Sequence, residues 1–178
     1  MNSTYLLRGV FQVIYGFLKA YEWLFCAGIL ISGGVFFVAF FYQDRYLFAL
    51  GCAFLRHLVC GIVLGFLVHE IAHVVFICLT MNELMRIELE FNLFRFSVRG
   101  IGSSTGRGIF ATALSGPIVA VVFGFILSIV FPDSGLLGWY VLHLLFLLPI
   151  FGDGRALVLV FGIGGVKCAL ISDACFVV

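Results

Sequence analysis

The stretch LVCGIVLGFLVHEIAHVVFICLTM, residues 58–81, decides how this chain folds. It is long enough for one helix to cross a bilayer, because roughly 20 helical residues span about 30 Å of hydrocarbon. Yet it carries His69, Glu70 and His73 in its middle. Each charged side chain at the centre of a bilayer costs at least about 2 to 3 kcal/mol. We therefore expect a chain that tolerates this cost to use these residues.

The three polar residues have the spacing HExxH. Imidazoles at positions i and i+4 project from one helical face about 6 Å apart along the axis, which allows both rings to bind one Zn²⁺. Glu70 then faces the metal-bound water as a base. The spacing predicts a zinc site with His69 and His73 as ligands. The alternative interpretation is a polar cluster that holds helices together.

The composition indicates an integral membrane protein. Of 178 residues, 63% are hydrophobic and 11% are charged, and the mean hydropathy is +1.23, far from the balance of a soluble domain. A net charge of +1 gives no indication of a nucleic-acid partner. No linker or internal repeat divides the sequence, so residues 1–178 are expected to form one domain in the lipid bilayer. The six cysteines lie mostly in apolar runs, without CxxC pairs, and are interpreted as buried small hydrophobic residues.

Four apolar stretches are long enough to span the bilayer. They are residues 24–41, 58–81, 109–131 and 135–160. Residues 46–55 are too short to span alone and form either the start of a long tilted helix or a surface turn. The first 23 residues interleave aromatic and charged side chains, which favours an amphipathic interfacial helix over a short first span. The expected fold class is an all-α polytopic membrane protein with about four to six transmembrane helices.

The segment between the second and third spans, residues 82–108, is the most polar part of the chain. It carries four arginines, whereas the loop at 131–135 has no basic residue, so the positive-inside rule places residues 82–108 and the N-terminus in the cytosol. Alternating apolar and polar residues predict two short strands, over 87–93 and 94–99, as a small β-insertion after the HExxH helix. Residues 100–108 are interpreted as a flexible connection.

A zinc site of this type needs a third protein ligand, and Asp153 is the best candidate. In LLPIFGDGR, residues 147–155, a proline and two glycines interrupt an apolar helix around this carboxylate, which is how a span opens its backbone to present a ligand. In the four-span topology the second and fourth spans run in the same direction. Asp153 can then meet His69 and His73 at similar depth. The alternative is that Asp153 caps a helix or pairs with Arg155.

Other polar residues in the apolar segments have simpler interpretations. His143, on the fourth span, is interpreted as a packed polar residue rather than a ligand. His57, beside Arg56, is interpreted as interfacial. The sequence Ser115-Gly116-Pro117 in the third span fits a small-residue packing seam and a kink.

The order of these motifs resembles the site-2 protease family of intramembrane zinc metalloproteases. The resemblance covers about residues 58–156, the catalytic core of that family, and rests on HEIAH at 69–73, Gly116-Pro117, and Pro149 followed by Asp153-Gly154. It implies Zn²⁺ as cofactor, with His69, His73 and Asp153 as its ligands and Glu70 as general base. The site is then expected nearer the cytosolic side of the cytoplasmic membrane.

The sequence also departs from the family pattern. Phe146 stands where the family usually has an Asn, the spacing from Pro149 to Asp153 is one residue short, and Ala120 and Val121 lie near the place of a second common Asn. The implied function is hydrolysis of peptide bonds in or near transmembrane segments of membrane proteins, in regulated intramembrane proteolysis or removal of signal remnants. A non-catalytic, protease-like protein that binds or gives immunity to a membrane-active peptide is the alternative. A zinc carrier is a third, disfavoured because only one ligand cluster is visible.

Overall fold

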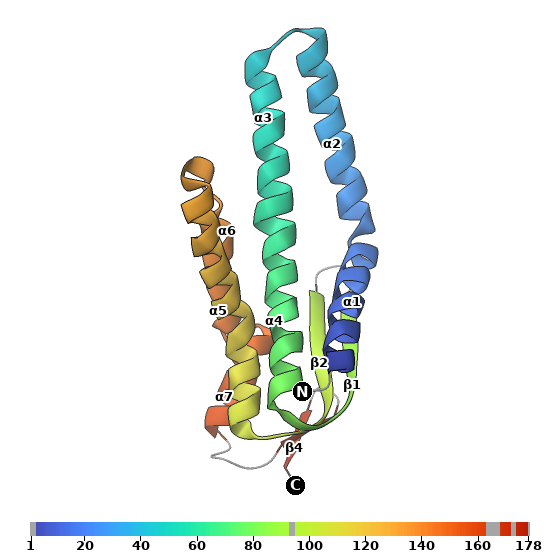
Figure 1. Ribbon diagram of the computed structural model, residues 1–178, viewed down its shortest axis with the longest axis vertical. Coiled ribbons are helices and arrows are strands. Elements are labelled where there is room, and N and C mark those ends of the chain that lie inside the picture. Colours follow the sequence, from blue (N-terminus) through green and yellow to red (C-terminus); the bar gives the residue numbers. More distant parts are fainter. Residues whose placement is uncertain (1–2, 93–94, 163–167, 172–173, 178) are drawn as a thin grey trace.

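The computed structural model describes residues 3–92, 95–162, 168–171 and 174–177. Most of these residues are helical, and a small sheet lies at one end of the molecule (Figure 1). Helices α2 (Glu22–Phe41) and α3 (Arg45–Arg56) form a hairpin that extends beyond α5 (Gly106–Val130) and α6 (Leu137–Val141). Helix α1 (Ser3–Ala20) lies beside the sheet.

Three helical stretches are long and apolar enough to cross a bilayer: Glu22–Phe41, Arg45–Thr80 and Gly106–Val130. A bent pair, Leu137–Leu147 and Gly152–Phe161, forms a fourth stretch with an angle of 42° between its halves. All four predicted apolar stretches are therefore helical. Within the described residues the number of such stretches is at most four, the lower end of the expected range.

The second stretch is one continuous column of 36 residues. It consists of α3, a π-helical segment η1 (His57–Val63) and α4 (Leu64–Thr80). At 1.5 Å per residue this column is about 54 Å long, well beyond the thickness of the hydrocarbon core. The first of the two interpretations of residues 46–55 is thus confirmed, because they begin this long helix.

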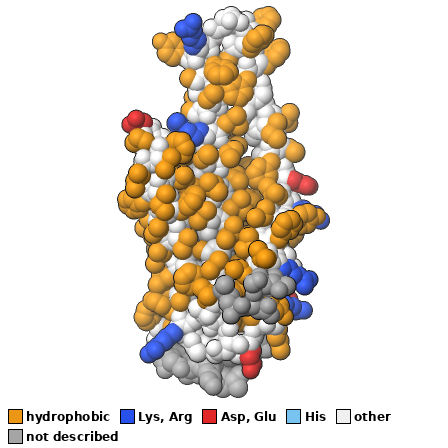
Figure 2. Space-filling model, in the orientation of Figure 1, with side chains coloured by type: hydrophobic (Ala, Val, Ile, Leu, Met, Phe, Trp, Pro, Cys, Tyr) orange, Lys and Arg blue, Asp and Glu red, His pale blue; other side chains and the backbone are white. Residues whose placement is uncertain are grey.

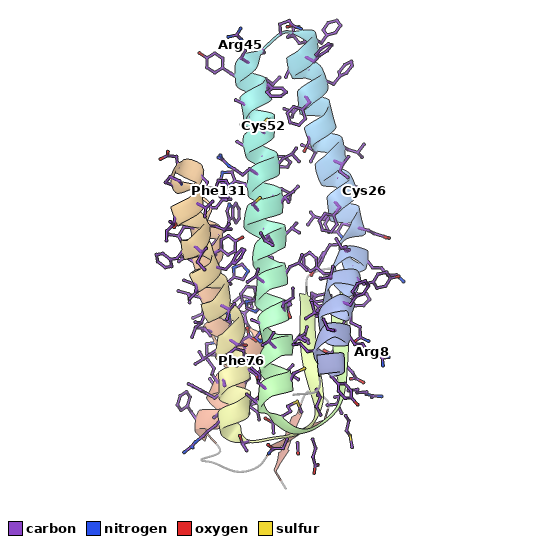
Figure 3. The ribbon with its side chains drawn as sticks, in the orientation of Figure 1. Arg8, Cys26, Arg45, Cys52, Phe76 and Phe131 are labelled. Carbon is purple, nitrogen blue, oxygen red and sulfur yellow. The ribbon has the colours of Figure 1, made fainter. Side chains whose placement is uncertain are left out.

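Asp44 determines where the α2–α3 hairpin turns. Its Oδ1 accepts hydrogen bonds from the backbone N–H groups of Tyr46 and Leu47, at 2.8 and 3.1 Å. An aspartate at this position satisfies N–H groups that the first helical turn leaves without partners. Arg45 follows at the tip of the hairpin, whereas Arg8 lies in the lower half of the view, beside the sheet (Figure 3).

The sheet follows α4 directly. Strand β1 (Met81–Asn92) pairs antiparallel with β2 (Arg95–Ser104), in a register that sets Glu88 opposite Arg99 and Leu89 opposite Val98. Two short strands near the C-terminus, β3 (Cys168–Ile171) and β4 (Ala174–Val177), extend it in the order β1-β2-β3-β4. The predicted β-insertion is confirmed, and β1 is an edge strand of the described sheet.

The prediction of a flexible connection over residues 100–108 is wrong. β2 continues to Ser104 because its last residues pair with the start of β1, where Met81 lies opposite Ser104. Helix α5 begins at Gly106, and Thr105 caps it by accepting a hydrogen bond from the N–H of Gly108 at 3.1 Å. The connection from sheet to helix is therefore a single residue.

Two apolar clusters hold the elements together. The first joins α1, α4 and β2 through the buried residues Val13, Val74, Ile77 and Val98. The second joins α5 to the segment around α6 through Ala120, Leu136 and Tyr140. Helix α4 contacts α1 and the sheet, and it also contacts α5.

Hydrophobic side chains cover most of the visible face of the molecule, and charged side chains gather at its edges and ends (Figure 2). This distribution suits a protein whose surface meets lipid tails.

The interpretation of the cysteines as buried residues is wrong for two of them. Cys26 and Cys52 are exposed, whereas Cys60 and Cys78 are partly buried. Cys168 and Cys175 have side chains outside the described part.

Close contacts fasten α6 to its neighbours. The hydroxyl of Tyr140 donates a hydrogen bond to the backbone carbonyl of Cys60 in the π-helical segment. Gly124 on α5 leaves room for the Tyr140 side chain, since a Cβ there would lie 2.4 Å from the Cβ of Tyr140. Tyr140 is fully buried, so its hydroxyl needs this partner.

We expect Tyr140→Phe to lower the free energy of unfolding by about 1 kcal/mol, because one buried hydrogen bond is lost while the ring still fills its place. Chemical or thermal unfolding of the protein in detergent micelles measures this. Tyr42→Phe is the matched control, since Tyr42 is 73% exposed. Equal stabilities of the two variants would contradict the assigned hydrogen bond.

Candidate metal centre

Helix α4 brings His69 and His73 together. The two residues are one turn apart, both are buried, and their Nε2 atoms lie 3.1 Å from each other. Their rings meet edge to face, with centroids 4.8 Å apart. The predicted pairing of the two imidazoles on one helical face is confirmed.

Asp153 reaches the same point from the fourth apolar stretch. Its Oδ2 lies 3.2 Å from Nε2 of His69, and its Oδ1 lies 3.4 Å from Nε2 of His73. The chain bends between the 3-10 segment Leu142–Leu147 and helix α7 (Gly152–Gly162), and Asp153 stands in the first turn of α7. The structure therefore brings all three predicted ligands together. Asp153 faces the two histidines, as the ligand interpretation requires.

The spacing of the two imidazoles fits a tetrahedral metal site. Metal–ligand bonds of about 2.0 to 2.1 Å at the tetrahedral angle hold ligand atoms about 3.3 Å apart. The two Nε2 atoms lie 3.1 Å apart, and each has a different carboxylate oxygen of Asp153 nearest to it, at 3.2 Å for His69 and 3.4 Å for His73. One ligand atom from each residue lies within 4.8 Å of the others, so the group can hold a metal ion. Three protein ligands leave the fourth tetrahedral position for water or substrate.

Thr112 on α5 orients one of the candidate ligands. Its backbone carbonyl accepts a hydrogen bond from Nδ1 of His73 at 2.9 Å. A ring that donates a hydrogen bond through Nδ1 has a free lone pair on Nε2. In His73, Nε2 is the nitrogen that faces Asp153 and His69. The sequence analysis missed this contact, because a backbone carbonyl leaves no signature in the sequence. Nδ1 of His69 has no hydrogen-bond partner among the described residues.

Two glycines allow the helices to approach this closely. A Cβ at Gly116 of α5 would lie 2.6 Å from Nε2 of His73 and 2.7 Å from Nε2 of His69. A Cβ at Gly154 would lie 2.0 Å from the carbonyl oxygen of Leu148, so only glycine permits the bend before α7. The close packing predicted around Gly116 is confirmed, and it lies directly over the candidate ligands. Helix α5 continues through Pro117, and no observation tests the predicted kink.

Glu70 provides a second buried carboxylate beside the triad. It is 6% exposed and lies about 100° around the helix axis from His69. It is close enough to His73 to interact with it electrostatically. The group of described residues that can hold a metal does not include Glu70, so the candidate centre itself has two imidazoles and one carboxylate.

His143 and Phe146 form an aromatic wall against His69. Their ring centroids lie 5.3 and 5.1 Å from that of His69. Nδ1 of His143 donates to the carbonyl of Trp139 at 3.1 Å, and the group of described residues that can hold a metal does not include His143. This agrees with its interpretation as a packed polar residue.

His57 lies away from this wall, in the π-helical segment. It accepts a hydrogen bond from Nε1 of Trp139 at 3.0 Å. No observation tests whether His57 lies at the membrane interface.

Three comparisons of this chain with known proteins were made. Neither protein-family models, nor curated proteins, nor solved structures give a match to this chain.

We expect Gly116→Ala to weaken metal binding by about 10- to 100-fold, the usual effect of disturbing groups that orient metal ligands, because its Cβ displaces both imidazoles. Titration of the purified protein with Zn²⁺, followed by calorimetry, measures the change. Gly138→Ala is the matched control, since a Cβ there meets nothing within 4 Å. Unchanged affinity in Gly116→Ala would argue against the assigned ligand positions.

Proposed function

We propose that this chain is an intramembrane zinc metalloprotease that resembles the site-2 protease family. One observation carries the proposal: two histidines of an HExxH motif and a distant aspartate converge inside helices of bilayer-spanning length, next to a buried glutamate. Ionisable groups in such helices are costly and usually functional. In this proposal the protein is an integral protein of the cytoplasmic membrane.

The donor set favours zinc. Imidazole nitrogens and carboxylate oxygens are ligands that Zn²⁺ accepts in tetrahedral sites, and catalytic zinc sites combine three protein ligands with one open position. His69, His73 and Asp153 would hold the ion. Zinc bound there supplies a Lewis acid and lowers the pKa of a bound water to about 7.

Glu70 acts as the general base in the proposed hydrolysis. It accepts a proton from the water whose oxygen attacks the scissile carbonyl carbon. When the C–N bond breaks, Glu70 returns this proton to the leaving amine, so one water is consumed and the carboxylate is restored. His73 stays oriented throughout by the Thr112 carbonyl.

The substrate in this proposal is a transmembrane protein or peptide. The amides of a transmembrane helix are bonded internally, so the helix must unwind locally before cleavage. The edge strand β1 begins where α4 ends, at Met81, and can pair with an extended substrate segment as an added strand. The four arginines between residues 82 and 108 favour a cytosolic position for this end of the molecule.

The identity of residue 146 favours a second candidate function, that of a non-catalytic binding protein. Phe146 stands where site-2 proteases usually have an Asn, and its ring packs against His69. A protein that retains the scaffold without the chemistry, and binds or gives immunity to a membrane-active peptide, would tolerate this replacement. Metal content and cleavage together distinguish the two functions.

We expect Glu70→Gln to abolish cleavage of a transmembrane peptide while keeping about one zinc per chain, because it removes the base and leaves the ligands. His69→Ala should lose both the metal and the activity. Cleavage is followed by mass spectrometry in detergent, and zinc by elemental analysis of the same samples.

A wild-type protein that is folded but free of metal would favour the binding function. Cleavage that persists in Glu70→Gln would remove Glu70 from the mechanism. Leu144→Ala, a change at a partly exposed position of the 3-10 segment, controls for detergent and preparation effects.

A further inference from the structure

A cavity of about 250 Å³ lies beside the candidate metal centre. Its walls come from the π-helical segment and start of α4 on one side, including Gly61 and Phe66, and from the fourth apolar stretch on the other. Trp139, Leu145 and Phe151 belong to the second wall. The cavity is therefore formed by the two segments that also carry His69 and Asp153.

Phe146 separates the cavity from the metal ligands. It lines the cavity, and the centroid of its ring lies 5.1 Å from that of His69 and 5.0 Å from that of Phe151. Phe151 stands two residues before Asp153. A group in the cavity would thus contact Phe146, whose ring in turn packs against the candidate ligand His69.

The cavity has the size and chemistry for one large apolar side chain. A buried apolar cavity of about 150 Å³ accommodates benzene, and pockets for drug-sized ligands begin near 300 Å³. A volume of about 250 Å³ lies between these limits. The lining side chains are aliphatic or aromatic, and only Trp139 and His143 carry ring nitrogens. Nε1 of Trp139 and Nδ1 of His143 are hydrogen-bonded within the protein, and Nε2 of His143 has no partner among the described residues.

The mouth of the cavity faces the apolar exterior. Leu142 and Leu145 line it and are 50% and 49% exposed. Both belong to the 3-10 segment of the fourth stretch, among neighbours that also expose apolar side chains. A group that enters between them comes from the lipid side, where a transmembrane substrate would be.

We propose that this cavity receives the side chain of a substrate residue adjacent to the scissile bond and thereby selects large apolar residues, such as leucine or phenylalanine, at that position. The inference rests on the proposed proteolytic function. Substrates would be defined by a large apolar residue beside the scissile bond. Leu145 and Phe146 would be the residues that determine this specificity.

The test compares two neighbouring leucines. Leu145→Trp fills the cavity, whereas Leu144→Trp adds the same bulk at a position that is 42% exposed and outside the lining. The substrates are transmembrane peptides with Leu, Phe or Ala beside the bond that the wild-type protein cuts. We expect Leu145→Trp to lower the ratio of kcat/KM for Leu over Ala by about tenfold or more, and Leu144→Trp to leave it unchanged.

Leu145→Ala provides the opposite change. It enlarges the cavity, so the kcat/KM for Phe relative to Leu should rise, a result that misfolding cannot produce. An unchanged residue preference in both Leu145 variants, with cleavage retained, would overturn the inference and leave the proteolytic function standing.

Photo-crosslinking gives a readout that does not need cleavage. A photo-leucine replaces the leucine beside the scissile bond in the peptide, which is mixed with Glu70→Gln protein in lipid nanodiscs, and the captured residues are identified by mass spectrometry. The inference expects capture of the cavity residue Phe146 well above capture of Leu144, which lies outside the lining. Capture of lipid alone, or equal capture of Phe146 and Leu144, overturns it. Capture of Phe146, together with a wild-type protein that cuts none of the peptides, would contradict the proteolytic function and support the cavity as a peptide site.

Discussion

The structure depends on the polar contacts that two buried histidines of one apolar helix make with other helices. His69 and His73 are buried in α4, where an unpaired polar group costs several kcal/mol. His69 and His73 meet each other and Asp153, and His73 also donates to the carbonyl of Thr112. These partners come from α5 and α7, so the polar cluster fixes the positions of both helices against α4.

Close approach of the helices is the second requirement, and glycine supplies it. Helices in lipid gain no hydrophobic driving force from meeting one another, so their packing depends on close contact between small residues. Gly116 brings the backbone of α5 against the two imidazoles, and Gly65 of α4 admits the ring of His143, whose Cε1 would lie 3.0 Å from a Cβ there. Gly116 and Gly65 therefore let neighbouring segments pack closely around the candidate centre.

Local patterns in the sequence predicted the parts of the structure that depend on local geometry. The i,i+4 spacing predicted the pair of imidazoles, and the period of two predicted the strands. Asp153 was predicted because Pro149 and the glycines at 152 and 154 break an apolar helix around it, and the described bend lies there. The family resemblance is a separate matter, since no comparison supports or contradicts it.

Features that depend on tertiary contacts were not predictable. The strand at 100–104 has a glycine-rich, turn-like sequence, but its pairing with the start of β1 overrides that preference. The Thr112 carbonyl belongs to the backbone and has no residue signature. Cys26 and Cys52 lie in apolar runs, and hydropathy cannot distinguish a side chain that faces lipid from one that faces a neighbouring helix.

The two sides of the candidate centre differ in exposure, and the proposed hydrolysis would need such a difference. Asp153 is 19% exposed, whereas the side chains of His69 and His73 are 3% and 7% exposed, so the carboxylate is the most exposed part of the triad. On another side Phe146 packs against His69 and lines an apolar cavity. In the proposed hydrolysis a water molecule would approach beside Asp153, whereas an apolar side chain would enter the cavity. Separate routes of this kind would allow a polar reaction beside lipid without opening the candidate ligands to it.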